Sequence, residues 1–145
     1  MIKKFEEHIA AGTIIKVSPN PPRADFLIKE SMNSLEGLNE RVEQIGINNK
    51  NANSIVKDCY DIIMGLVRAR LTLDGYNSSG SYAHEAEVSY LAKLNFLSNE
   101  VDFLNELRSF RNSVIYYGNI LDEEYAGEVF KFMNKLLPRL HSLFK

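Results

Sequence analysis

The chain has 145 residues, of which 45% are hydrophobic and 25% are charged, and this composition excludes a disordered or fibrous protein. Its 17 Lys and Arg residues against 19 Asp and Glu residues give a net charge of −2 at pH 7, so any contact with nucleic acid or anionic lipid must be local. The single cysteine, Cys59, excludes an intrachain disulfide and a cysteine-based zinc cluster.

Three further features bear on where the protein works. A single cysteine is typical of a reducing compartment, and the first eight residues lack the apolar run of a signal peptide. No uncharged stretch of about 18 residues is present that could cross a bilayer. We therefore expect a cytoplasmic protein with no membrane association, folded as one domain over residues 1–145.

The first part of the chain predicts a short helix, a rigid connector and a long helix. Residues 2–11 can form a helix, but Gly12 and the proline-rich segment 18–22 interrupt it, because proline removes a backbone donor and restricts the residue before it. Over 23–45, apolar residues recur at three- and four-residue steps, which indicates one buried helix face. Gly46 suits the end of this helix.

The middle of the chain predicts two more helices. Asn51 or Asn53 can cap a helix that runs to Gly75, a residue suited to the left-handed position after a helix. The apolar stripe of this helix is wide, which predicts that it is central in the fold. After a loop over 76–80, Ser81 is a candidate cap for the next helix.

Two long helices complete the prediction. The helix over 98–117 begins with a serine cap and an acidic first turn, and Gly118 follows its end. The last helix begins at 122–124 and includes Pro138, where we expect a kink or the boundary of a tail, because an interior proline costs about 3 kcal/mol. Without a convincing alternating strand, these elements predict an all-α, up-and-down bundle of four to five main helices with a short N-terminal helix.

Arg111 is the first candidate functional residue. It lies close to the apolar stripe of its own helix, while Arg108 and Asn112 lie on an adjoining face. One interpretation is that its planar fork of donors binds a phosphate or carboxylate. The other is that it pairs with a carboxylate such as Glu106 or Asp102, or extends along the helix into solvent.

Three further residues join the candidate site. Tyr116 is four residues beyond Asn112 and shares its helix face, whereas Tyr117 is explained as well by aromatic packing at a helix end. His84, at the start of a helix, is interpreted either as a general base or RNA contact, or as a surface or capping residue.

Other catalytic signatures are missing from the sequence. It has no Gly-rich phosphate loop, no Gly-x-Ser-x-Gly elbow and no histidine pair with a metal-binding spacing, so we expect neither a metal nor another cofactor. Arg68 and Arg70 are open to two interpretations: they add positive charge to a cleft, or they compensate the dipole at the end of their helix.

The motif helix resembles that of a known family. A helical bundle whose penultimate long helix carries Leu-Arg-Ser-Phe-Arg111-Asn112-Ser-Val-Ile-Tyr116 is similar to the HEPN superfamily (higher eukaryotes and prokaryotes nucleotide-binding). The signature of that family is an Arg, commonly followed by Asn, with a His four to six residues later. The segment 81–85 is similar to one in several prokaryotic members, and the resemblance covers about residues 23–140.

The resemblance implies a homodimer in which two motifs meet to form a metal-independent ribonuclease site. Arg111 would then stabilise the phosphate in the transition state, and Asn112 would orient groups in the cleft. Tyr116 stands where the family's histidine should act, and a phenol with a pKa near 10 is a poor general base at pH 7. His84 is the residue that could substitute for it across the cleft.

We therefore expect a HEPN-like domain that binds a nucleotide, RNA or a protein partner, without catalysis because of Tyr116. One alternative is a metal-independent ribonuclease of the toxin–antitoxin type, paired with a small nucleotidyltransferase protein. Another is a structural interaction protein in which Arg111 forms only a salt bridge. The candidate site consists of three residues for catalysis and three for ligand binding: Arg111, Asn112 and Tyr116, and Arg108, His84 and Tyr117.

Overall fold

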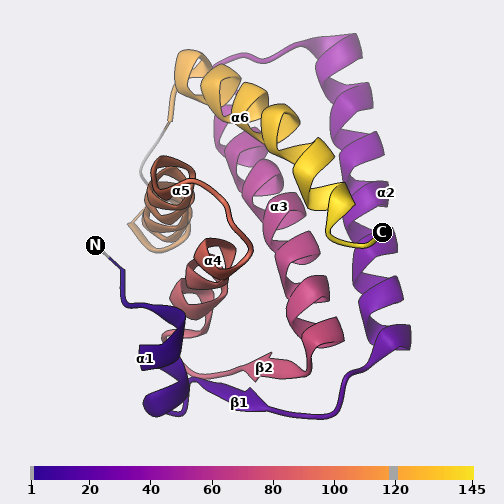
Figure 1. The fold of residues 1–145 in the computed structure, drawn as a ribbon. Helices are drawn as coiled ribbons and strands as arrows, with labels where there is room; N and C mark the ends of the chain where they lie inside the picture. Colours follow the sequence, from indigo (N-terminus) through magenta and orange to yellow (C-terminus); the bar gives the residue numbers. More distant parts are fainter. Residues whose placement is uncertain (1, 118–120) are drawn as a thin grey trace.

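A computed structural model describes the backbone of residues 2–117 and 121–145, and the side chains of 2–112 and 121–145. Within these residues the chain forms an all-α bundle with a short N-terminal helix, which confirms the predicted fold class (Figure 1). The elements are, in chain order, α1 (Phe5–Ala10), β1 (Ile14–Lys16), α2 (Pro21–Ile45), α3 (Ala52–Asp74), β2 (Tyr76–Ser78), α4 (Ala83–Lys93), α5 (Ser98–Tyr117) and α6 (Glu123–Ser142).

The central element is α3, as its wide apolar stripe predicted. It contacts α2, α4, α5 and α6, and Figure 1 shows α2 on one side of it, α4 and α5 on the other, and α6 crossing its upper part. Gly65 lets α2 approach closely, because a Cβ atom at this position would overlap the Oγ of Ser31. Each fully buried leucine or isoleucine of this core contributes about 1.5–3 kcal/mol. The side chains of α3 that are 1% exposed or less include Ile55, Ile62, Ile63, Leu66 and Val67.

The ends of α2 and α3 follow from particular residues. The predicted ends at Gly46 and Gly75 are confirmed, with φ of 80° and 82°. The start of α2 differs from the prediction, since the helix includes Pro21 and the proline after it. Asn20 accepts a hydrogen bond from the N–H of Arg23 at 3.1 Å, and prolines fit the first helical positions, where the missing N–H groups have no intrahelical partner to lose.

Two other predicted caps are wrong in detail. Asn51 precedes α3, but its side-chain oxygen accepts from the N–H of Asn48 at 2.9 Å instead of capping the helix. Ser81 is not the cap of α4, which begins at Ala83 after Tyr82 and has no side-chain cap. At Asn51 the local turn uses the polar group that the sequence assigned to the helix.

The paired strands β1 and β2 were not predicted. They run antiparallel with Ile14 opposite Ser78, so the prediction of a loop over 76–80 is wrong for its first three residues. Strands of three residues are too short to show an alternating pattern. Beside this ladder, α1 packs on α4, and the rings of Phe5 and Tyr90 have centroids 4.6 Å apart.

The last helix continues through Pro138 to Ser142, so the predicted tail boundary is wrong. Proline removes the hydrogen bond that would otherwise reach the carbonyl of Asn134. Both residues are exposed, so water can satisfy that carbonyl. On the opposite face of α6, Leu136 and Leu140 are fully buried, and their packing holds the helix together across the proline.

Candidate functional site

Arg111 leaves the surface of α5 and reaches α3. Its Nε donates to Oδ1 of Asp61 at 3.1 Å, and its guanidinium lies 5.9 Å from the centre of the Tyr60 ring. The carboxylate partner is therefore on a neighbouring helix, and not one turn away on α5 at Glu106 or Asp102 as the sequence suggested. Glu106 instead accepts from the hydroxyl of a tyrosine on α6.

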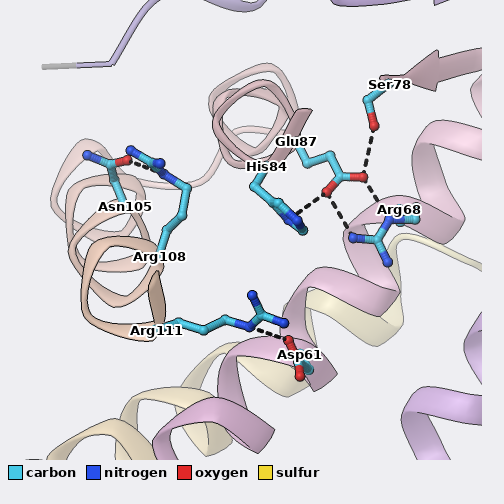
Figure 2. Close-up of polar contacts among 8 residues, drawn as sticks. All are labelled: Asp61, Arg68, Ser78, His84, Glu87, Asn105, Arg108 and Arg111. Atoms are coloured by element: carbon cyan, nitrogen blue, oxygen red, sulfur yellow. Dashed lines mark hydrogen bonds and ion pairs between the residues drawn. The ribbon is translucent and has the colours of Figure 1, made fainter. Parts of the chain in front are cut away.

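The pair between Arg111 and Asp61 is weakly held. The side chain of Asp61 is 42% exposed and also lies 3.4 Å from the ammonium of Lys57. Exposed pairs of this kind contribute less than about 1 kcal/mol. Figure 2 shows Arg111 bound to Asp61 through Nε, and among the described residues its two Nη groups have no acidic partner. The arginine therefore keeps donors available for an anion.

Tyr60 lies beneath this arginine in the core. Its side chain is 1% exposed, and its hydroxyl has no hydrogen-bond partner in the described part of the chain. Burial raises the pKa of Tyr60, and the negative charge of Glu87 raises it further, whereas Arg108 and Arg111 oppose the shift. The charges of two arginines and one glutamate thus act on the same buried phenol.

The other α5 candidates differ in what they contact. Arg108 is half-buried, and its Nε donates to Oδ1 of Asn105 at 3.0 Å, so the guanidinium turns back along its own helix (Figure 2). Asn112 is half-buried next to Arg111. The backbone of Tyr116 and Tyr117 belongs to α5, but their side chains lie outside the described residues.

A second polar cluster joins α3, α4 and β2. Glu87 is buried, and its carboxylate accepts from Arg68 at two nitrogens, Nε at 2.7 Å and Nη2 at 2.9 Å, and from the hydroxyl of Ser78 at 3.0 Å. The hydrogen bonds that Arg68 donates to Glu87 raise the pKa of Arg68. His84 lies 3.6 Å from the same carboxylate and is 49% exposed (Figure 2). The bidentate geometry of the Arg68–Glu87 pair is the strong form of an ion pair.

The cluster forms one wall of a pocket of about 320 Å³, which we call the polar pocket. It lies between the start of α2, the second half of α3, β2 and the start of α4. Its position brings His84 together with Arg68. The interpretation of His84 as a helix cap is wrong, because α4 has no side-chain cap. The polar residues around it include Arg23, Arg68, Asn77, Ser78, His84 and Glu87.

Sequence reasoning left two arginines ambiguous and missed their acidic partners. Arg70 has a structural role, because it pairs with Asp74 at 2.9 Å and donates to the carbonyl of Leu143 at 2.6 Å. Arg68 faces the polar pocket instead. The signal for its partner was present in the sequence, since Glu87 shares a helix face with Ala83 and Leu91, where a charge requires a counter-charge.

Comparison with protein-family models, with curated proteins and with solved structures found no match to this chain. Within the described residues, no group of three or more His, Cys, Asp or Glu side chains is arranged to hold a metal ion. None of the described helices is long and apolar enough to span a membrane.

Proposed function

We propose that this chain is a HEPN-like domain that binds RNA or a nucleotide by its phosphate, with Arg111 as the principal contact. The observation that supports the proposal is the incomplete pairing of the Arg111 guanidinium among the described residues. The half-buried side chain is held by one carboxylate, Asp61, and keeps both Nη groups unpaired among the described residues. A phosphate can use those two donors in the bidentate geometry that a guanidinium favours.

Local charge supports a phosphate ligand on a chain whose net charge is −2. Arg108 lies one turn before Arg111 on α5, and both positive charges act electrostatically on Tyr60. Asp61 offsets one of them while it is bound to Arg111. A phosphate that displaces Asp61 exchanges an exposed ion pair, worth less than about 1 kcal/mol, for a stronger charge-assisted contact.

We further propose that the ligand binds without hydrolysis, in a groove between two copies of the chain. Tyr116 occupies the position of the family's histidine, and a phenol cannot act as an efficient base near pH 7. One observation favours the alternative of a metal-independent ribonuclease: the half-exposed imidazole of His84 lies on the same side of α3 as Arg111 in Figure 2.

The binding test is fluorescence anisotropy with labelled single-stranded RNA and with a labelled nucleotide. Arg111→Ala is expected to weaken binding by tenfold or more. Arg41→Ala is the matched control, because Arg41 forms a similar surface ion pair with Asp58 on α3. It is expected to change the affinity less than twofold. No binding of either ligand, or equal loss in both variants, would refute the proposal.

A cleavage assay separates binding from catalysis, and light scattering tests the dimer. RNA incubated with the protein and EDTA is expected to stay intact. Cleavage that disappears in both Arg111→Ala and His84→Ala would instead establish the ribonuclease alternative. Light scattering is expected to give the mass of two chains, and a purely monomeric species would contradict a shared groove.

A further inference from the structure

The polar pocket is a second site, separate from the α5 motif. It is built from α2, α3, β2 and α4, and none of the α5 residues whose side chains the structure describes lines it. A smaller cavity of about 230 Å³ adjoins it near the start of α2, and Arg23 and Asn77 border both. Arg23 therefore borders both cavities.

The charges around the pocket do not cancel. Glu87 is neutralised by Arg68 through two hydrogen bonds. Arg23, which is exposed, has no acidic partner in the described part of the chain. One positive charge thus remains uncompensated at a pocket whose only carboxylate is already paired.

The hydrogen-bonding groups around the pocket are mainly donors. The hydroxyl of Ser78 is used by Glu87, and that of Thr72 donates to a backbone carbonyl of its own helix. The first turn of α4 borders the pocket, and within the described chain the backbone N–H groups of His84 and Glu85 have no acceptor. Such N–H groups at a helix start favour an anion. A ligand that accepts hydrogen bonds and carries negative charge therefore suits the part of the pocket between Arg23 and the first turn of α4.

We propose that the polar pocket binds a compact phosphate monoester of about the size of a sugar phosphate. The phosphate lies against Arg23 and the first turn of α4, where its oxygens accept from the guanidinium and the N–H groups. The rest of the ligand fills the pocket beside His84. A volume of about 320 Å³ is at the lower end of small-molecule sites, which excludes a longer nucleic-acid segment.

The test is isothermal titration calorimetry of the full chain with ribose 5-phosphate, inorganic phosphate and ribose. Ribose 5-phosphate is expected to bind most tightly, inorganic phosphate more weakly, and ribose not at all. Arg23→Gln is expected to weaken the binding of ribose 5-phosphate about tenfold. Lys29→Gln, which removes one charge from an exposed position of the same helix outside the pocket, is the matched control and is expected to stay within twofold.

Arg111→Ala distinguishes this site from the proposed RNA surface. It is expected to leave the affinity for ribose 5-phosphate unchanged. Loss of binding in this variant, or an unchanged affinity in Arg23→Gln, would overturn the pocket assignment whether or not RNA binds. As a second measurement, the NMR amide signals of Asn77, His84 and Glu85 are expected to shift with added ribose 5-phosphate. Shifts confined to other residues would overturn the assignment too.

Discussion

Arg68 and Glu87 bind each other through two nitrogens and two oxygens, at 2.7 and 2.9 Å, and tie the centre of α3 to α4. The side chain of Glu87 is 3% exposed, so its charge depends on this partner. Arg68→Ala leaves a buried carboxylate unpaired and is expected to lower the free energy of unfolding by about 3 kcal/mol. Urea denaturation measures the change.

The double variant Arg68→Met with Glu87→Leu is the control for this prediction. It removes both charges and fills their volume with apolar atoms, so it is expected to recover most of the lost stability. If it is as unstable as Arg68→Ala, the loss comes from packing of the arginine stem and not from the unpaired charge.

The close contact between Gly65 and Ser31 predicts that Gly65→Ala destabilises the protein when Ser31 is present and stabilises it when Ser31 is replaced by alanine. Gly65→Ala alone is expected to destabilise the protein by about 1–3 kcal/mol, because the new methyl group overlaps the Oγ of Ser31. In the Ser31→Ala background that atom is gone, the remaining Cβ is 3.5 Å away, and alanine gains up to about 1 kcal/mol of helix propensity. Denaturation of all four proteins measures the coupling. Equal effects in the two backgrounds would contradict the close contact.

Cys59 is expected to resist thiol reagents in the folded protein. It is fully buried, and burial raises the pKa of its thiol from 9.0 to about 12. Its contribution to stability is present below pH 9 and is lost as the pH rises toward 12, because the unfolded thiol ionises first. Reaction with a chromogenic disulfide at pH 8 should match the rate of global opening. Fast labelling without urea would contradict this burial.

Glu100 is expected to contribute to acid sensitivity. Burial by itself raises the pKa of this carboxyl, but hydrogen bonds from Arg139 and from the N–H of Leu97 outweigh it, so the net pKa is lowered. The contribution to stability is therefore present above the ordinary carboxyl pKa and is lost as the pH falls through the lowered one. Glu100→Gln should flatten the dependence of stability on pH below about 5. The same slope in both proteins would count against this role.

Asp61 is expected to compete with the proposed phosphate ligand for Arg111. Asp61→Asn removes that competitor and one negative charge, so RNA should bind a few-fold more tightly. Asp58→Asn removes an equal charge from the pair with Arg41 and controls for the overall field. Anisotropy at two salt concentrations measures both. An equal gain in the two variants would assign the effect to net charge alone.

The sequence predicts the main helices well because burial requires a continuous stripe over many residues. The width of the stripe on α3 identified the central helix, and Gly46 and Gly75 marked two ends. The short strands escaped prediction because their pairing depends on contacts between distant segments, such as Ile14 with Ser78. Pro21 was misread because proline both breaks and starts helices, and only the cap at Asn20 decides which.

The candidate site was predictable only in part. The sequence identified Arg111 as a charge near an apolar face, but its partner Asp61 is 50 positions away, on another helix. Likewise the sequence singled out Arg68 but not Glu87, although the two residues form one ion pair. Pairwise contacts across helices depend on packing angles that periodicity does not contain.

The ladder between β1 and β2 also affects the order in which the chain assembles. It closes a loop that contains the whole of α2 and α3. The two helices are joined by a short connection and can pair from contacts close in sequence, whereas the strands meet only after that long loop has closed. We therefore expect the segment that carries α1 and β1 to dock only after α2 has packed on α3.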